Sequence, residues 1–338
     1  MGPRRHLGAT LVKDSAANLR RFVEGNLAHG IDHLLVVHDG PPDPDVRQLL
    51  EEASDVTMVV ADDVWWRGDR PVTLNARQRA VANLARVLAT ELGFVDWLFF
   101  LDGDEVAVLD RQLLADLPAD VPAVRLLPLE SVTTTTGEVP SLFKHLLEKP
   151  QLRRLHRDGL IAEPRNQAYF RGHVTGKTGL RPSHDVRSWV HAVVTETDEK
   201  VPLLEHPGLR HLHFESPSYD EFVRKWTALA TSGPPPAVRA ARARVLETVL
   251  AAQDAPAPTR EEMLRDLYAE AALDDVEELE ARELLVRFDV TRPTSDHVPL
   301  TAEQHSALAH ALDLVAPLPK QLFLPSTPTT DLLAALGR

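Results

Sequence analysis

Between residues 7 and 129, short apolar runs alternate with segments whose apolar residues recur at helical spacing. The longest helical segment covers residues 73–92 and is followed by Gly93. The apolar runs have the length of strands and lie at residues 7–12, 34–37, 56–60, 97–101 and 123–127. Such alternation is typical of βαβ units, in which a helix connects two parallel strands. It predicts an α/β fold with a mostly parallel sheet flanked by helices.

The second half of the chain has a looser pattern. Residues 130–217 are rich in polar residues and turn signals, which is typical of loops that carry function on a rigid sheet. Helical spacing returns at residue 219 and is interrupted by a proline run at residues 233–236. We therefore expect one domain at residues 1–232 and a helical C-terminal extension with a proline-rich end at residues 233–338.

Composition excludes several classes of protein. The chain has 338 residues and no cysteine, which excludes disulfide frameworks, thiolate metal sites and cysteine nucleophiles. Its formal net charge of −13 argues against nucleic-acid binding, because phosphate backbones require a basic surface. Since no run of about 18 uncharged apolar residues occurs, we expect no membrane span and a cytoplasmic location. The abundance of Ala, Arg, Leu and Pro is typical of a GC-rich bacterial genome.

The C-terminal extension is expected to pack on the domain or on a second copy, which would form a homodimer.

The apolar run at residues 97–101 ends abruptly in a group of acids. Asp102 and Asp104 flank Gly103, and Glu105 follows. Open α/β sheets bind their ligands at the carboxyl ends of strands, so these acids are expected at a site. Carboxylate oxygens suit Mg²⁺ or Mn²⁺, and a glycine between them allows the backbone to approach a phosphate closely. The pattern predicts a metal-diphosphate site.

Further motifs accompany this group in a fixed order. Four motifs precede it: a lysine turn, a His-x-x-Gly-Val-x-His-like segment, a strand ending in Asp, and a helix carrying Arg, Gln and Asn. They lie at Lys13, Leu27 to His33, Asp39, and Arg77, Gln78 and Asn83. A Gly-Lys-x-x-x-Arg-Pro segment, a His and a His-x-His segment follow it, at Gly176 to Pro182, His191, His211 and His213. In this order the chain resembles GT-A-fold glycosyltransferases of family 2, in a divergent branch related to family 92.

The resemblance implies transfer of a sugar from a nucleoside diphosphate sugar donor to an acceptor that the motifs do not specify. Residues 1–232 would be the catalytic domain, and Mn²⁺ or Mg²⁺ would bridge the diphosphate. The metal ligands would be Asp102, Asp104 and His191. The alternating His211 and His213 point to one face of a strand, where they would bind the metal or the acceptor.

The same resemblance assigns the donor contacts. Asp102 would contact the donor, and Gly103 would mark the point of closest approach. Asp39 would accept hydrogen bonds from the base or ribose. Positive charge around the phosphates would come from Lys13, Arg77, Lys177 and Arg181.

The catalytic base follows from the reaction class rather than from a motif. An inverting transferase needs a carboxylate or histidine within hydrogen-bond reach of the acceptor hydroxyl. Glu130, just past a predicted strand, and Asp185, in the loop region after Arg181, are the candidate bases.

Two other functions fit part of the pattern. The segment from Asp102 to Val106 also matches the signature of haloacid-dehalogenase-like phosphatases, in which Asp102 would be the nucleophile and Asp104 an acid or base. That signature belongs after the first strand of its domain, whereas three strands precede it here. A non-catalytic nucleotide-sugar-binding module is the other alternative, because Ser15 stands where the family has an acid.

Overall fold

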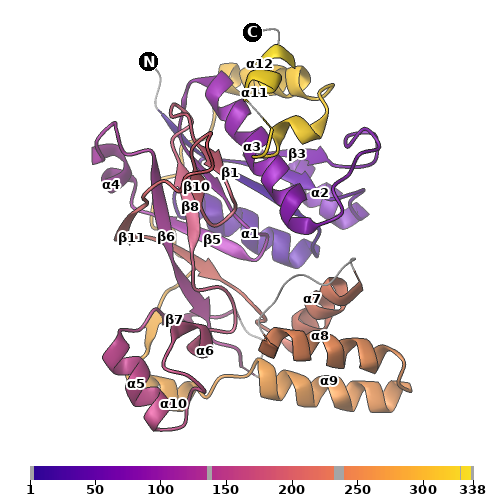
Figure 1. The fold of residues 1–338 in the computed structure, drawn as a ribbon, viewed down its shortest axis with the longest axis vertical. Helices are drawn as coiled ribbons and strands as arrows, with labels where there is room; N and C mark the ends of the chain where they lie inside the picture. Colours follow the sequence, from indigo (N-terminus) through magenta and orange to yellow (C-terminus); the bar gives the residue numbers. More distant parts are fainter. Residues whose placement is uncertain (1–3, 135–138, 232–239, 328, 336–338) are drawn as a thin grey trace. The chain divides into compact units, whose positions relative to one another are not determined.

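The computed structural model describes residues 4–134, 139–231, 240–327 and 329–335. The chain forms two compact units that are interleaved in sequence. Unit 1 consists of Met1–Leu127, Thr175–His211 and Val290–Arg338, and unit 2 of Pro128–Val174 and Leu212–Asp289 (Figure 1). The proline run at residues 233–236 and the expected boundary after residue 232 lie outside the described residues.

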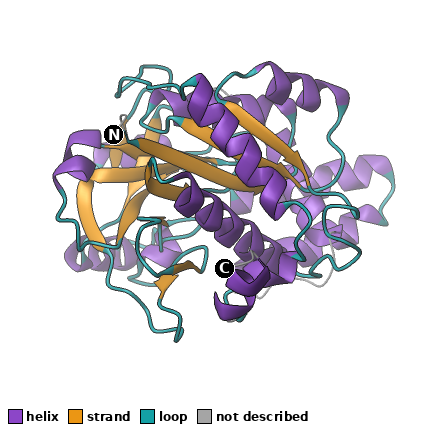
Figure 2. Cartoon of the chain, turned by 90° about the horizontal axis from the view of Figure 1, so that it is seen from above, coloured by secondary structure: helices purple, strands orange, loops and turns teal. Residues whose placement is uncertain are grey.

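Unit 1 contains a central set of parallel strands. Their spatial order is β4 (Val95–Phe100), β1 (Arg5–Val12), β2 (His33–His38) and β3 (Val56–Val60). The helices between them in the chain are α1 (Ala16–Ala28), α2 (Pro44–Glu52) and α3 (Leu74–Leu92). Figure 2 shows orange strands covered by purple helices. The α/β class is confirmed, and the arrangement is consistent with a GT-A fold.

The other edge of this sheet is antiparallel. Strand β8 (Lys177–Leu180) pairs antiparallel with β4, and the first part of β6 (Ala123–Ser131) pairs antiparallel with β8. Strand β11 (Leu204–His213) pairs with β6 and with β5 (Glu105–Leu109). The parallel arrangement expected from the βαβ pattern therefore holds for β1 to β4, whereas β8 and β6 join the sheet by antiparallel pairing.

Alternation along the strands explains the two layers of core. On β2, Leu35 and Val37 face a cluster that includes α3, whereas Leu34 and Val36 face a cluster that includes Leu19 of α1. All four β2 residues are fully buried, as expected for a strand covered on both faces.

Local signals define the helix ends. The Ser15 side chain accepts a hydrogen bond from the Asn18 backbone and so caps α1, and Thr73 caps α3 in the same way through Ala76. Helix α3 ends at Gly93, whose φ of 65° is the left-handed conformation that favours glycine.

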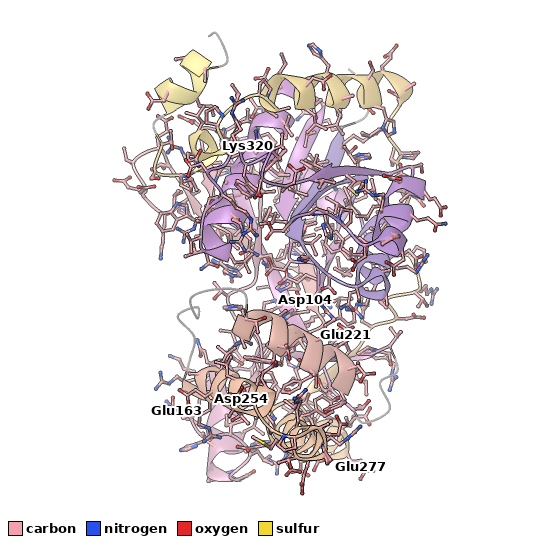
Figure 3. The ribbon with its side chains drawn as sticks, turned by 90° about the vertical axis from the view of Figure 1, so that its right-hand side faces the viewer. Asp104, Glu163, Glu221, Asp254, Glu277 and Lys320 are labelled. Atoms are coloured by element: carbon pink, nitrogen blue, oxygen red, sulfur yellow. The ribbon has the colours of Figure 1, made fainter. Side chains whose placement is uncertain are left out.

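Unit 1 is completed by short elements and by the end of the chain. The short elements are α4 (Arg111–Asp116), β9 (Arg187–Ser188) and β10 (Val193–Val194), and the C-terminal ones are α11 (Ala302–Val315), the 3₁₀ helix η1 (Lys320–Phe323) and α12 (Thr329–Ala335). Helix α11 packs on α3. The buried Lys320, labelled in Figure 3, donates to the backbone carbonyls of Ala316 and Leu318 at 2.9 and 2.7 Å, and burial lowers its pKa to about 8. This lysine therefore satisfies carbonyls just past the end of α11.

Unit 2 has a small antiparallel sheet and a helical part. The sheet is formed by the end of β6, β7 (Leu142–His145) and β12 (Leu285–Arg287), accompanied by α5 (Lys149–Arg157), α6 (Asn166–Tyr169) and α10 (Val276–Ala281). The helical part consists of α7 (Tyr219–Thr231), α8 (Ala240–Gln253) and α9 (Ala257–Ala271). Its core contains Trp226, Leu246, Val249 and Tyr268. Among the helices of the described residues, none is long and apolar enough to cross a membrane.

Candidate functional site

The acidic turn after β4 is closely packed against β1. Gly103 lies so near the end of β1 that a Cβ atom on it would be 2.5 Å from Val12 Cγ2. Only glycine fits this position without displacing Val12. The backbone of Asp102 donates to Glu105 Oε2 at 2.9 Å, and the Glu105 backbone donates to the Asp102 carbonyl at 3.0 Å. The turn is therefore held in one conformation beside the loop that begins with Lys13.

Lys177 joins this turn from 75 residues further along the chain. Its Nζ lies 2.6 Å from Asp102 Oδ2 and 3.2 Å from Glu105 Oε2, and its side chain is fully buried. The position follows from the antiparallel register of β8 on β4, which pairs Leu180 with Leu98 and leaves Lys177 at the acidic end. Burial lowers the pKa of Lys177, but the two carboxylates outweigh it and raise the pKa above its ordinary value.

Asp102 is bound on both carboxylate oxygens. Oδ2 contacts Lys177, and Oδ1 accepts a hydrogen bond of 2.8 Å from Gln78 Nε2 on α3. Burial raises the pKa of Asp102, but the Lys177 ammonium outweighs this and holds it below its ordinary value. The side chain is nevertheless 31% exposed, so its ionised carboxylate can still meet a ligand.

Histidines lie near this cluster of charges. His211 Nε2 is 3.5 Å from Glu105 Oε1, and both side chains are buried. His191 Nδ1 lies 3.1 Å from the carbonyl of Gly176, the residue before Lys177. His191 lowers the pKa of Asp102 electrostatically and Asp104 raises it. Two of the predicted metal ligands of unit 1 therefore act electrostatically on the third.

Two further predicted donor contacts, Lys13 and Asp39, follow the parallel strands β1 and β2. Lys13 is exposed directly after β1. Asp39 follows β2 and is bound by two arginines: Arg70 approaches both of its oxygens at 2.9 Å, and Arg77 Nε donates to Oδ2 at 3.1 Å. Arg77 also donates to the carbonyls of Pro71 and Val72. The Arg77 side chain therefore anchors the loop before α3 to Asp39.

Two predicted site residues lie away from the acidic turn. Arg181 follows β8 at the end opposite to Lys177 and stacks 4.7 Å from the ring of Trp97, near the start of β4. Asp185 is exposed and acts electrostatically on Arg86. Arg86 is two turns of α3, about 12 Å, beyond Gln78. The structure does not bring either residue to Asp102.

Glu130, the other candidate base, belongs to unit 2. Its buried carboxylate lies 2.8 Å from Lys144 Nζ and accepts hydrogen bonds from the backbones of Arg171 and Gly172. Lys144 also contacts Asp274 at 3.0 Å. Burial raises the pKa of Glu130, but Lys144 outweighs it and lowers the pKa overall. These contacts keep Glu130 ionised and bound, and its role as a base stays a prediction.

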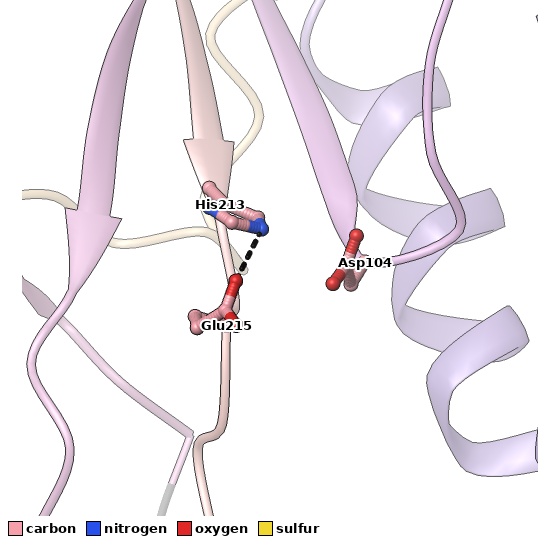
Figure 4. A group of neighbouring side chains, drawn as sticks. All are labelled: Asp104, His213 and Glu215. Atoms are coloured by element: carbon pink, nitrogen blue, oxygen red, sulfur yellow. Dashed lines mark ion pairs between the residues drawn. The ribbon is translucent and has the colours of Figure 1, made fainter. Parts of the chain in front are cut away.

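His213 also belongs to unit 2. Its Nε2 lies 3.2 Å from Glu215 Oε2, the ion pair drawn in Figure 4, which also labels Asp104 of unit 1. Glu215 is further contacted by Lys225 at 3.2 Å and Arg242 at 2.8 Å. The carboxylate therefore orients His213 and links the end of β11 to α7 and α8.

The sequence predicts no specific contact for four residues of these networks. They are Gln78, Glu105, Lys144 and Glu215. A signal was present for two of them, because Glu105 begins an apolar strand and Lys144 follows Phe143 within one. A charged residue inside a buried strand needs an opposite charge, although the pattern does not say which one.

No protein-family model matches the chain, and no curated protein matches its sequence. Among solved structures, similarity is found to the mannosyltransferase PcManGT from Pyrobaculum calidifontis in complex with GDP-Man and Mn²⁺, with 12% identity, a TM-score of 0.32, and coverage of 99% of this chain and 86% of that one. The galactosyltransferase LgtC, in complex with donor and acceptor sugar analogues, is 14% identical with a TM-score of 0.25, over 52% of this chain and 58% of that one. The bifunctional glycosyltransferase WbbM is 12% identical with a TM-score of 0.25, over 54% of this chain and 32% of that one.

Proposed function

We propose that this chain is a metal-dependent glycosyltransferase that transfers a sugar from a nucleoside diphosphate sugar to an acceptor. One observation carries the proposal: the Asp102-Gly103-Asp104 turn at the carboxyl end of a central strand, with Asp102 partly exposed and held by Lys177. In α/β sheets this is the place where nucleotides bind.

The acids of the turn, together with His191, have the chemistry to bind a divalent cation. Asp104 and Asp102 offer carboxylate oxygens, and His191 offers an imidazole nitrogen, a donor set that suits Mn²⁺ and is compatible with Mg²⁺. Asp104 would be the principal ligand, because both oxygens of Asp102 already contact Lys177 and Gln78. A bound cation supplies Lewis-acid stabilisation of the charge that develops on a departing diphosphate.

The resemblance implies that Lys177 contacts the phosphates, whereas its contacts in the structure support a positioning role. Its ammonium lies between Asp102 and Glu105, so it would position Asp102 instead of binding a phosphate directly. Lys13, exposed beside the turn, would then provide the positive charge near the phosphates. We further propose that the transfer inverts the anomeric configuration and that the base is Glu130 or Asp185. His211 or His213 would contact the metal or the acceptor. The chain would form a homodimer and be located in the cytoplasm.

A phosphatase of the haloacid-dehalogenase type is less compatible with this geometry. Its nucleophilic carboxylate would be Asp102, which follows the fourth strand of unit 1 in chain order and has both oxygens bound. Such a phosphatase would also need a second pair of acids, for which the adjacent Asp274 and Asp275 are the candidates. Asp274 contacts Lys144 in unit 2.

Donor binding tests the proposal directly. Thermal denaturation with a panel of UDP- and GDP-sugars, with and without Mn²⁺, is expected to show a metal-dependent rise in Tm of about 5 °C with the correct donor at a hundredfold excess over Kd. Release of the nucleoside diphosphate would report turnover. Asp104→Asn should abolish both effects, and Asp116→Asn, at an exposed acid of α4, is the matched control. Unchanged metal-dependent binding by Asp104→Asn would refute the assignment, whereas binding without turnover would identify a binding module.

A further inference from the structure

Helix α5 of unit 2, labelled in Figure 1, concentrates positive charge in an acidic chain. The chain has 37 basic and 50 acidic residues, yet four of the nine residues of α5 are Lys or Arg and none is acidic. All four are exposed. We call them the basic face, and they are Lys149, Arg153, Arg154 and Arg157.

The basic face lies opposite the apolar side of the helix. Leu152 and Leu155 are buried in a core cluster of unit 2. Positions 149, 153 and 157 recur every four residues, so their side chains form one row about 12 Å long on the other side of α5. Arg154 lies next to this row. Helix α5 is therefore amphipathic, and its exposed charges all have the same sign.

Acids of the same chain leave the basic face largely unneutralised. Three of its members form no ion pair among the described residues, and these are Lys149, Arg153 and Arg154. Arg157 has one contact, at 3.4 Å from Asp158, and its side chain is still 75% exposed. Asp158 is itself bound by Arg282 at 2.7 Å. The basic face can therefore meet an external anion.

The row of cations also has an internal cost. Like charges four residues apart on a helix repel each other, and the row contains two such pairs. Exposed arginines of the other helices of unit 2 are paired instead: Arg244 of α8 contacts Glu270 at 2.7 Å, and Arg265 of α9 contacts Glu261 at 2.6 Å. A negatively charged partner would relieve the repulsion within α5.

Both ends of α5 are fixed by local hydrogen bonds. The Glu148 backbone donates to the Gln151 side chain at 3.0 Å, as part of a capping box. At the other end, Gly159 has a φ of 79° and the Leu160 backbone donates to the Leu155 carbonyl at 2.9 Å, as in a Schellman motif. Leu160 is 44% exposed, so an apolar side chain is held just beyond the basic face. The surface is formed before a partner binds, which lowers the entropic cost of binding.

We propose that the basic face and Leu160 dock this protein on an anionic membrane surface. Outward-facing cations match negatively charged lipid headgroups, and an exposed leucine can enter the apolar boundary beneath them. A soluble polyanion would satisfy the cations but leave Leu160 in water. The acids elsewhere in the chain do not prevent docking, because charges more than about 8 Å away are screened at physiological salt. This inference does not depend on glycosyl transfer.

Co-sedimentation of the full chain with vesicles tests the proposal. Vesicles of phosphatidylcholine alone are compared with vesicles that contain about 30% phosphatidylglycerol, at about 0.15 M salt. We expect binding to the anionic vesicles only, and loss of most of it at about 1 M salt, where the Debye length is about 3 Å. Equal binding to both kinds of vesicle, or no binding to the anionic ones, would overturn the proposal.

A double variant tests the basic face itself. The combined change of Arg153→Gln and Arg154→Gln affects two exposed side chains and should keep the Tm of the parent. Each basic residue near an anionic surface raises affinity about fivefold, so vesicle binding should fall about 25-fold. The matched control, Lys200→Gln with Arg292→Gln, changes two exposed cations of unit 1 and has the same net charge. It should bind like the parent, and an equal loss in both double variants would overturn the assignment to α5.

A change of Leu160 distinguishes a membrane from a soluble polyanion. Leu160→Ser should weaken vesicle binding about fivefold, because its exposed apolar surface would no longer leave water on docking. Leu314→Ser, at a leucine of α11 that is 47% exposed, is the matched control and should bind like the parent. Inorganic polyphosphate serves as the soluble probe. Vesicle binding that is unaffected by Leu160→Ser, together with equally tight binding of polyphosphate, would identify a soluble polyanion and overturn the proposal.

Discussion

Each unit contains a buried lysine that bridges two carboxylates of its own. The two pairs of carboxylates differ in their exposure to solvent. In unit 1, Lys177 contacts Asp102 and Glu105 at 2.6 and 3.2 Å. In unit 2, Lys144 contacts Glu130 and Asp274 at 2.8 and 3.0 Å. Both ammonium groups are 1% exposed or less, and the pKa of each is raised, because its carboxylates outweigh the effect of burial.

The carboxylates of the two networks differ in exposure. Asp102 is 31% exposed, whereas Glu130 and Asp274 are 1% and 8% exposed. Glu130 also accepts hydrogen bonds from two backbone amides. The unit 2 network is therefore closed to solvent, whereas one carboxylate of the unit 1 network remains accessible. A buried ion pair by itself does not identify a functional site, and the exposure of one partner distinguishes the two.

The largest effect is expected from Lys144→Met. Both carboxylates would lose their cation without gaining water, and breaking a buried pair in this way costs about 4 kcal/mol. Chemical denaturation would measure the free energy of unfolding. Lys149→Met, at the exposed start of α5, should stay within about 0.5 kcal/mol of the parent. A similarly small loss in Lys144→Met would show that its network is not the closed structural element described above.

Lys177→Met should destabilise less and affect binding more. Water can reach Asp102, so we expect a loss near the lower end of the range for buried pairs, about 3 kcal/mol. The Asp102 carboxylate would no longer be held in place, and metal-dependent donor affinity should fall at least about tenfold. Lys200→Met, at an exposed lysine of unit 1, is the control for both measurements. Donor affinity equal to that of Lys200→Met would show that Asp102 does not depend on Lys177.

The smallest effect is expected from Asp185→Asn. This acid is exposed and acts on Arg86, away from the acidic turn, and surface changes of this kind usually alter stability by less than about 0.5 kcal/mol. Because Asp185 acts on Arg86, away from the acidic turn, we prefer Glu130 of the two candidate bases and expect donor-dependent turnover of Asp185→Asn to equal that of the parent. A large loss of turnover with intact donor binding would instead identify Asp185 as the base.

Much of unit 1 is predictable because its signals are local. The expected strand at residues 56–60 matches β3 (Val56–Val60), and the expected helix at residues 73–92 differs from α3 (Leu74–Leu92) by one residue. Ser15 caps α1 with its own side-chain hydroxyl, three residues before the amide that it accepts from. In each case the information lies within one helical turn or one alternating run.

The site is only partly predictable. Lys177 and Arg181 are four residues apart and were expected around the same phosphates, yet they lie at opposite ends of β8, on Asp102 and Trp97. At the spacing of a strand their Cα atoms are about 13 Å apart, and each side chain is occupied by its own contact, with Asp102 or with Trp97. Arg77, expected at the phosphates too, instead contacts Asp39.

The sequence alone determined the order of strands and helices from β1 to β4 and the position of the carboxylates after a central strand, because apolar periodicity and turn residues act over a few neighbours. Only the tertiary structure decided which charges meet. Lys177 reaches Asp102 through the antiparallel register of β8 on β4, Arg77 reaches Asp39 from the first turn of α3, and Lys144 joins Glu130 to Asp274 across 130 residues. Such pairings depend on strand direction and register, and these are set by contacts between residues that are distant in the chain.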